Sequence, residues 1–409
     1  MAAFGASASH KVDGQLMQRA NRAIALALIR RDPATSRASI ARETALSPAA
    51  VSGIVDHLIR EGLVREEPAT TTGAVGRRPM RLIFNPAAHV AVGIAVDVRV
   101  VTVALVDLGG GVRTAIRAPL PPGASPTTVV DRVASAARRA LRGVAAGDVV
   151  GIGMAVPGLV RWPEGLILLS PNLGWRDVPI RALVEERLGR PVVVDNEVRA
   201  LALAEHAYGA ARGARTAVFI DAAYGVGGAI IIDGGLYRGV RGVAGELGHN
   251  IVEPDGARCG CGNRGCLETV ASAGGLVARA REALDNGRAS VLAAARDALT
   301  LDAIVGAARA DDPLARDLVT RATAYLGRAA AHAIDNWDPE RVVLSGPVVQ
   351  AGADLFDDVL VAERRSVLDT GHAGVPVVRA TLGLDDAKVI GAATLVTAEY
   401  LGVPSITSW

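Results

Sequence analysis

Residues 245–268 read GELGHNIVEPDGARCGCGNRGCLE, and this stretch contains every cysteine of the chain: Cys259, Cys261 and Cys266. His249 lies ten positions before the first cysteine. Three thiols and one imidazole make up the donor number of a structural zinc ion, which takes four ligands in a closed tetrahedron. The glycines between the cysteines let a short loop turn its thiolates inward. The spacing therefore predicts one structural Zn²⁺ per chain, held in a loop over residues 249–268.

The alternative is that these are three incidental buried thiols, since free cysteine is often buried. That alternative does not explain why all three cluster beside the Gly-Glu-Leu-Gly-His run. Cysteines that serve a metal are typical of a reducing compartment, so we expect a cytoplasmic protein. No apolar run approaches the ~20 residues of a membrane span, and residues 1–14 lack the apolar core of a signal peptide.

Charge is spread unevenly along the 409 residues, although the formal net charge is only +2. Residues 1–81 contain 12 Lys/Arg and 7 Asp/Glu, which leaves the rest of the chain mildly acidic. A basic N-terminal segment on an acidic body indicates nucleic-acid binding at one end only.

Residues 15–86 are expected to form a winged helix-turn-helix, after a disordered tail over residues 1–14. A helix over 15–31 is predicted to bury one face, formed by Leu16, Ala20, Ile24 and Leu28. A second helix over 36–44 and a tight turn over 45–47 follow. Ser47 then caps a third helix that begins at Pro48 and ends at Gly62. Two short strands, 63–65 and 80–84, enclose a wing loop that ends in Gly-Arg-Arg-Pro.

The first turns of the third helix would face the major groove, and their side chains are small: Ser47, Ala49, Ala50 and Ser52. Direct base readout is therefore expected to be sparse. Arg77 and Arg78 of the wing suit a narrow, A·T-rich minor groove, while Arg37 and Arg42 are expected to contact phosphates. The alternative is a small helical domain that binds protein or mediates dimerisation, but it gives the wing arginines no role.

From Val90 the pattern changes to strands and helices of an α/β domain, over residues 87–409. Strands are predicted at 90–98, 100–108, 148–156, 191–195 and 217–221, with helices at 127–142, 180–188 and 199–208. A second series over 230–237, 276–284, 314–334 and 341–344 repeats this theme. The chain is therefore expected to be an α/β protein with two lobes behind its winged helix-turn-helix.

Several motifs over residues 90–400 occur in the order in which the ROK family (repressors, open reading frames and sugar kinases) carries them. They are Ser170-Pro-Asn-Leu-Gly-Trp175, Val194-Asp-Asn-Glu197, Gly225-Val-Gly-Gly228, Asp233-Gly-Gly-Leu-Tyr-Arg-Gly239, Gly245-Glu-Leu-Gly-His249 and the cysteine run ending in Cys266-Leu-Glu268. The chain resembles the repressor branch of this family, because residues 1–85 match its DNA-binding extension. The resemblance implies an actin/hexokinase-like body with two lobes.

The resemblance also implies a sugar site, made by Asn172, Asn196, Glu197, Glu246, His249 and Glu268. Carboxylates and amides suit a polyhydroxy ligand, because each pairs with two hydroxyls. His249 would give one nitrogen to zinc and present the other to a sugar hydroxyl. The alternatives are that the glutamates are ordinary solvated or capping carboxylates and that the asparagines only shape loops.

Where the family's kinases carry phosphate-binding motifs, this chain departs from them. Ala95 stands where the resemblance places an acid, and Asp97-Val98-Arg99 replaces a glycine turn. Ala222-Ala223-Tyr224 replaces a leading Gly-Thr, and the stretch 344–347 keeps only one glycine of the usual pair. Glu197 stands where kinases have an aspartate base, and its longer side chain displaces the carboxylate. We therefore expect no kinase activity and no ATP.

These observations predict a cytoplasmic, sugar-responsive transcriptional regulator, more in keeping with a repressor than an activator. Its expected partners are double-stranded operator DNA and a sugar or sugar-phosphate effector, with no membrane, and it is expected to be a homodimer or a dimer of dimers. Two alternatives stand beside this hypothesis. One is an active ATP-dependent sugar kinase with an auxiliary DNA-binding domain, and the other is a constitutive DNA-binding protein whose body only oligomerises.

Overall fold

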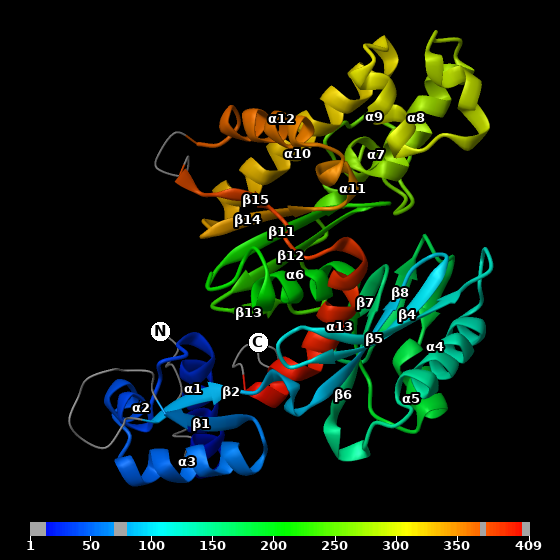
Figure 1. Cartoon of the computed structure of the whole chain (residues 1–409). Helices are drawn as coiled ribbons and strands as arrows, with labels where there is room; N and C mark the ends of the chain where they lie inside the picture. Colours follow the sequence, from blue (N-terminus) through cyan, green and yellow to red (C-terminus); the bar gives the residue numbers. More distant parts are fainter. Residues whose placement is uncertain (1–13, 69–79, 369–373, 403–409) are drawn as a thin grey trace, which may run out of the picture. The chain divides into compact units, whose positions relative to one another are not determined.

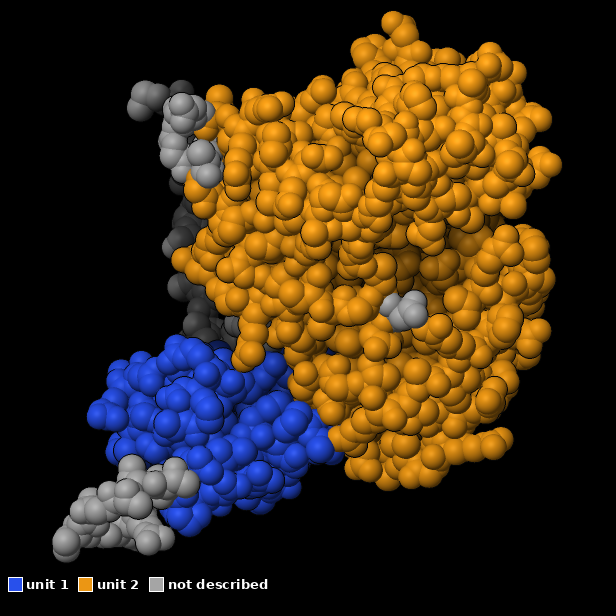
Figure 2. All heavy atoms as spheres, turned by 45° about the horizontal axis from the view of Figure 1, so that its top comes forward, with its two compact units in different colours: residues 1–89, 397–407 blue, residues 90–396, 408–409 orange. Residues whose placement is uncertain are grey.

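The computed structural model describes residues 14–68, 80–368 and 374–402, which form two compact units (Figure 2). The first unit comprises the described residues up to His89 together with those from Thr397 onward, and the second comprises Val90–Val396. Figure 1 shows the elements of both. Within the described residues no helix combines the length and apolar character needed to cross a membrane.

The first unit contains a helix-turn-helix and a strand pair. Its elements are α1 (Gly14–Arg31), α2 (Arg37–Thr44), α3 (Pro48–Arg60), β1 (Val64–Pro68), β2 (Met80–Phe84) and the 3-10 turn η1 (Pro86–Ala88). Ser36 caps α2 through a reciprocal capping box, and Ser47 caps α3 with Pro48 at its first position. Ala45 ends α2 in the left-handed conformation (φ 56°), which makes the turn between the two helices. Local sequence signals thus set these boundaries.

The predicted apolar face of α1 is wrong. Ile24 is 48% exposed, whereas Ala25, Leu26 and Ile29 are buried. A strict row of every fourth residue drifts around a helix of 3.6 residues per turn, so it cannot follow one packed face. The predicted wing tip, with Arg77 and Arg78, lies outside the described residues.

The first lobe of the second unit is built on a five-stranded sheet with the order β10-β6-β3-β4-β5. These strands are β3 (Val90–Val96), β4 (Val100–Asp107), β5 (Val112–Pro119), β6 (Val149–Val156) and β10 (Val193–Asn196). β6 and β10 run parallel to β3, whereas β4 and β5 continue the sheet in antiparallel pairing. The predictions did not include β5. A three-stranded sheet joins this lobe: β7 (Leu159–Arg161), β8 (Leu166–Ser170) and β9 (Trp175–Val178).

The two faces of β3 are packed differently because successive side chains point to opposite sides of a strand. Val90, Val92, Ile94 and Val96 belong to a core with α4 (Pro126–Ala140) and α5 (Ile180–Leu188). Ala91 and Ala95 belong to a second core with α6 (Glu197–Tyr208) and α13 (Leu384–Leu401). The second face must be small, because a Cβ on Gly93 would lie 2.0 Å from the carbonyl oxygen of Val389. α13 is therefore held against the sheet backbone.

The second lobe contains a sheet with the order β13-β12-β11-β14-β15. Its strands are β11 (Ala217–Ala222), β12 (Val226–Ile232), β13 (Gly235–Tyr237), β14 (Arg341–Ser345) and β15 (Val377–Arg379). Its helices are α7 (Glu268–Ala271), α8 (Ala273–Asp285), α9 (Leu301–Arg309), α10 (Pro313–Trp337), α11 (Pro347–Gln350) and α12 (Ala353–Arg364). The 3-10 turns of the second unit are η2 (Ala146–Asp148), η3 (Leu247–His249) and η4 (Val291–Ala298). Together the lobes confirm the predicted α/β body with two lobes behind a winged helix-turn-helix.

Candidate functional site

The first turns of α3 carry the side chains that were predicted to face DNA. Ser47, Ala49 and Ala50 are exposed, and Ser52 is half-buried. The hydroxyl of Ser47 accepts from the backbone N–H of Ala50, so it serves the helix end as well as the surface. The exposed side chains of this face are therefore small, as the sequence predicts.

The two arginines that were predicted to contact phosphate differ in the structure. Arg37 lies 2.7 Å from Asp56 and 2.8 Å from Glu66, and it also donates to the carbonyl of Ser52. Hydrogen bonding to Glu66 raises the pKa of Arg37 despite partial burial. Arg42 is exposed and makes no ion pair among the described residues. Arg37 therefore ties α2 to α3 and β1, whereas Arg42 is available to DNA.

We expect Arg42→Ala to weaken binding to a mixed-sequence DNA duplex and to reduce the salt slope of log K by about one, because one phosphate contact is lost. Arg37→Ala should chiefly lower the stability of the first unit, by up to about 1 kcal/mol for partly exposed pairs. Fluorescence anisotropy over a sodium chloride series measures the slope. Arg138→Ala, at an exposed arginine of α4, is the control. An unchanged slope for Arg42→Ala would contradict the assignment.

Four predicted ligands of a metal ion meet in one place. The donor atoms of His249, Cys259, Cys261 and Cys266 all lie within 4.8 Å of one another. The Cys259 Sγ lies 3.7 Å from the His249 Nδ1, and the Cys261 Sγ lies 3.7 Å from the Cys266 Sγ. Burial raises the pKa of the Cys259 and Cys266 thiols. The group can hold a metal ion, whose charge would stabilise the thiolates.

Local backbone pairing brings these ligands together. Ile251 pairs with Cys266 in an isolated antiparallel bridge, and Arg258 pairs with Arg264 across the cysteine turn. Gly265 has a φ of 67°, and a Cβ there would lie 1.5 Å from the carbonyl oxygen of Glu253. No other residue fits that position, so the glycine lets the last cysteine fold back onto the loop.

The predicted sugar-binding residues fall into two adjoining groups. In the first, the Glu246 carboxylate lies 4.0 Å from the His249 Nε2, on the opposite side of the ring from the cysteines. Burial raises the pKa of Glu246, and the charges of Arg199 and His249 oppose that rise. Glu268 accepts from the backbone N–H of Val226 at 3.2 Å, and its other carboxylate oxygen faces the Cys259 thiol.

The second group is the beginning of α6. The carbonyl oxygen of Asn196 caps this helix by accepting from the N–H groups of Val198 and Arg199, and its amide donates to Gly158. Asn196 thus has the loop-shaping role that the sequence left as an alternative. Asn172 is exposed in the turn between β8 and β9. Its neighbour Pro171 lies against Gly260 of the metal loop.

The sequence analysis did not single out Lys388. This residue lies near the beginning of α13, and its ammonium pairs with two carboxylates from other elements. Its Nζ lies 2.6 Å from Glu197 and 3.2 Å from Asp97. Burial alone would lower the pKa of Lys388. The charges of Glu197, Asp97 and Asp221 outweigh this effect and raise the pKa above its usual value, so the ammonium stays charged. Burial raises the pKa of Asp221 to about 6 in spite of Lys388. One sequence signal existed, because the chain has only two lysines, Lys11 and Lys388.

A buried ion-pair triad lies next to this group, and it was also missed. Asp195 is fully buried and lies 3.0 Å from Arg199 and 2.9 Å from Arg238. Arg199 also donates to the carbonyl of Ala244 at 3.3 Å, and Arg238 stacks over Trp162 at 4.1 Å. The triad therefore joins α6 to the segment that leads into Glu246.

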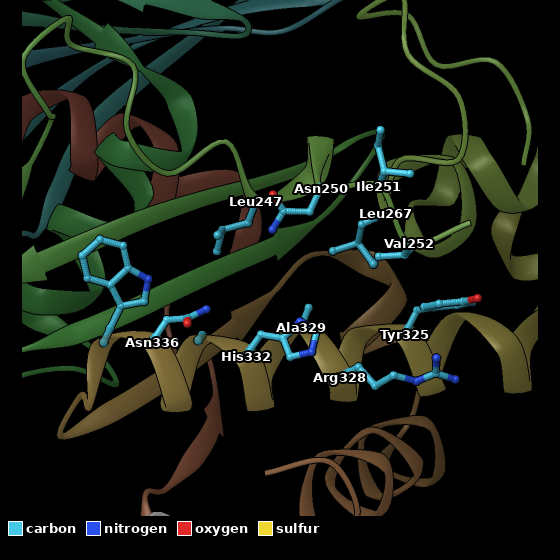
Figure 3. A pocket seen from close by; sticks show the side chains of 12 residues that line it. Leu247, Asn250, Ile251, Val252, Leu267, Tyr325, Arg328, Ala329, His332 and Asn336 are labelled. Atoms are coloured by element: carbon cyan, nitrogen blue, oxygen red, sulfur yellow. The ribbon is translucent and has the colours of Figure 1, made fainter. Parts of the chain in front are cut away.

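A hollow of about 280 Å³ lies between the metal loop and α10 (Figure 3). Leu247, Asn250 and Leu267 face Arg328 and His332 of α10 across it. No predicted sugar-binding residue lines this hollow. It is therefore distinct from the group around Glu246.

A winged helix-turn-helix joined to a two-lobed body with a Cys₃His cluster defines a transcriptional regulator built on a sugar-kinase type of fold. Residues 91–399 match the ROK family, and residues 25–65 match a winged helix-turn-helix DNA-binding family. The chain belongs to the ROK family. Two curated relatives and one solved structure show how the likeness is distributed along the chain.

The DNA-binding transcriptional dual regulator NagC of Escherichia coli K12 is 31% identical over 393 residues, which cover 94% of each chain. A glucokinase of Halalkalibacterium halodurans is 40% identical over 253 residues, which cover 61% of this chain and 76% of the glucokinase. A solved ROK family transcriptional regulator, a homologue of the E. coli MLC protein, is 30% identical. It has a TM-score of 0.79 and covers 95% of this chain and 98% of that one.

Proposed function

We propose that this chain is a sugar-responsive transcriptional repressor that binds operator DNA through its first unit and a sugar through its second. The observation that carries the proposal is that regulators match the chain over nearly its whole length, DNA-binding unit included. The kinase relative matches less of the chain, although it is more identical where it matches. A homodimer or a dimer of dimers would place two helix-turn-helix units on a near-palindromic operator.

The metal of the Cys₃His group is, in this proposal, one structural zinc ion per chain. Thiolates about 2.3 Å from a tetrahedral zinc lie about 3.8 Å from one another. The separation of the Cys261 and Cys266 sulfurs, 3.7 Å, fits that arrangement. His249 would bind through Nδ1 and keep Nε2 for the ligand side. The ion would supply structural support for the loop and for Glu268 beside it.

The sugar site is proposed to comprise Asn172, Asn196, Glu197, Glu246, His249 and Glu268. Glu246 carries most of this proposal, because it is partly exposed and the described structure gives it no hydrogen bond. Its carboxylate can accept two sugar hydroxyls, as polyhydroxy ligands require. Glu197 is held by Lys388, so it would bind a sugar only as part of that ion pair.

The alternative hypothesis is an active kinase, and three features of the second unit disfavour it. Ala95 is buried in the core with α13, so an acid at that position would face apolar side chains. Lys388 forms an ion pair with Glu197, which stands where the related kinases are expected to carry their proton-accepting base. Asp97 caps its own turn by accepting from the N–H of Val98, in place of a glycine turn that could approach a phosphate.

We expect no ADP release above background when the protein is given Mg-ATP with glucose, N-acetylglucosamine or xylose. A coupled spectrophotometric assay measures the release, with a sugar kinase as the positive control. Turnover near the ordinary kinase range of about 1–100 s⁻¹ would contradict this expectation.

The proposed response to sugar runs through α13, which contributes residues to both units. Its beginning carries Lys388, and Val389 packs against the first sheet. Tyr400, near its end, belongs to the first unit, where Arg22 donates to its carbonyl and His89 packs edge-on against its ring. A sugar can change operator affinity only if it binds the DNA-bound and free states differently.

The test of the function is operator affinity during a sugar titration. We expect Glu246→Ala to leave operator affinity near the wild-type value without sugar, and to reduce the response to sugar by about tenfold or more, because a carboxylate that accepts sugar hydroxyls is lost. Glu282→Ala, at an exposed carboxylate of α8, is the control. The operator is first selected from a random duplex library. A wild-type protein that binds DNA with no response to any sugar would support the constitutive alternative.

A further inference from the structure

The proposed sugar site has several acidic groups, and its buried cations are all held in ion pairs. Asp97, Glu197 and Asp221 surround the one ammonium of Lys388, which leaves a formal charge of −2 when all are ionised. Asp97 directly follows β3, Glu197 begins α6 and Asp221 lies in β11, so the group lies where the two lobes meet. Glu246 and Glu268 add two more carboxylates nearby.

The buried cations of this region are already paired in the described structure, and the one exposed arginine of the Asp97 turn, Arg99, lies on the solvent side. Lys388 contacts Glu197 and Asp97, and Arg199 and Arg238 share Asp195. An anionic ligand would have to displace a carboxylate from one of them. The displaced carboxylate would stay beside the ligand and repel it, because both are held in a partly buried site where charges interact strongly.

Three of the backbone donors that could bind a phosphate here are also engaged. A helix N-terminus attracts anions through its first N–H groups, but in α6 those of Val198 and Arg199 donate to Asn196. In the Gly225–Gly228 turn, the N–H of Val226 donates to Glu268. A Cβ on Gly225 would lie 2.3 Å from the same carboxylate, so Glu268 lies directly on the glycine backbone.

We propose that the effector is an unphosphorylated sugar and that Asp97, Glu197 and Lys388 exclude phosphosugars from the site. A phosphate monoester carries about two negative charges at pH 7, and it would meet a net negative group with its cation and its N–H donors already engaged. A neutral sugar needs acceptors for its hydroxyl groups, which the carboxylates provide. This inference rests on the proposed function, because it concerns the same ligand site.

The experiment compares matched pairs on the full-length protein by isothermal titration calorimetry at pH 7.5. The pairs are glucose with glucose 6-phosphate and N-acetylglucosamine with N-acetylglucosamine 6-phosphate. In a pair that binds, the phosphate should be at least about tenfold weaker than the free sugar, which corresponds to about 1.4 kcal/mol. The affinity ratio, which is the Kd of the phosphosugar divided by the Kd of the free sugar, should fall as sodium chloride rises from 0.05 to 0.5 M, because salt screens the repulsion.

Two variants change the charge in opposite directions, and the readout is the affinity ratio within each pair. Asp97→Asn should lower the affinity ratio, because it removes one carboxylate and releases one contact of Lys388. Lys388→Met should raise the affinity ratio, because the site loses its ammonium. Asp131→Asn, at an exposed aspartate of α4, should leave the ratio unchanged.

The outcomes separate this inference from the proposed function. A phosphosugar that binds as tightly as its free sugar, or more tightly, would overturn the inference and leave the sugar-responsive function standing. A ratio that stays at the wild-type value in Asp97→Asn would overturn the role of the charge network. If neither member of either pair binds, this inference fails for these ligands, whereas the proposed function is decided separately by the operator titration with the wider set of sugars.

Discussion

The Cys261→Ser protein is expected to lose its metal and to unfold at a markedly lower temperature than the wild type. Cys261 supplies one of four donor atoms that lie within 4.8 Å of one another, and a hydroxyl is a much poorer zinc ligand than a thiolate. Because binding energy at a structural zinc site is also folding energy, we expect a loss of at least about 2 kcal/mol. The loop should also release Glu268, which lies beside Cys259.

Elemental analysis and thermal unfolding measure these two effects, with and without a chelator. Asn263→Ser, in the same turn, is the matched control, because the Asn263 side chain is exposed and only its backbone carbonyl takes part in the loop. The control should keep about one zinc per chain. A Cys261→Ser protein that retains full metal and unchanged melting would falsify the metal-site assignment.

A second large effect is expected from Asp195→Asn. Asp195 is fully buried between the guanidinium groups of Arg199, which is 1% exposed, and Arg238, which is 9% exposed. Removing one member of a buried ion-pair group leaves uncompensated charge, which costs about 3–5 kcal/mol. Here two arginines lose their shared carboxylate, so we expect the upper part of that range.

Urea unfolding measures the free energy of unfolding of Asp195→Asn against two comparisons. Asp131→Asn removes an exposed partner of Arg187 and should cost less than about 1 kcal/mol. A triple variant with Asp195→Leu, Arg199→Met and Arg238→Met should recover much of the loss, because no unpaired charge remains. Equal effects of Asp195→Asn and Asp131→Asn would contradict the view that burial makes this group important.

The elements of the DNA-binding unit were predictable because their signals are local. Ser36, Ser47 and Pro48 act within four residues of the helix ends that they cap. The buried face of α1 was not predictable in the same way, since several residues of that helix are apolar and only tertiary packing selects Leu26 and Ile29 over Ile24.

The metal group was predictable for a similar reason. Cys259, Cys261 and Cys266 lie within eight residues, and His249 lies ten residues before the first of them, so local pairing within one loop is enough to bring the four donors together. The ligand residues were visible only through family resemblance. The resemblance did not show that the side chain of Asn196 caps α6, or that Glu197 forms an ion pair with Lys388.

The sequence by itself determined the helix-turn-helix and the metal ligands, because each depends on contacts between residues near in the chain, and it indicated the two-lobed body through its motifs. The sheets of that body pair strands far apart in the chain, such as β11 with β14. Tertiary structure alone brought Lys388 to Glu197 and Asp97, which precede it by 191 and 291 residues. It also brought Arg238 to Asp195 and engaged Arg37 with two carboxylates. Charges act through space, so the electrostatics of the ligand site follow from how strands and helices pack, which the order of residues does not display.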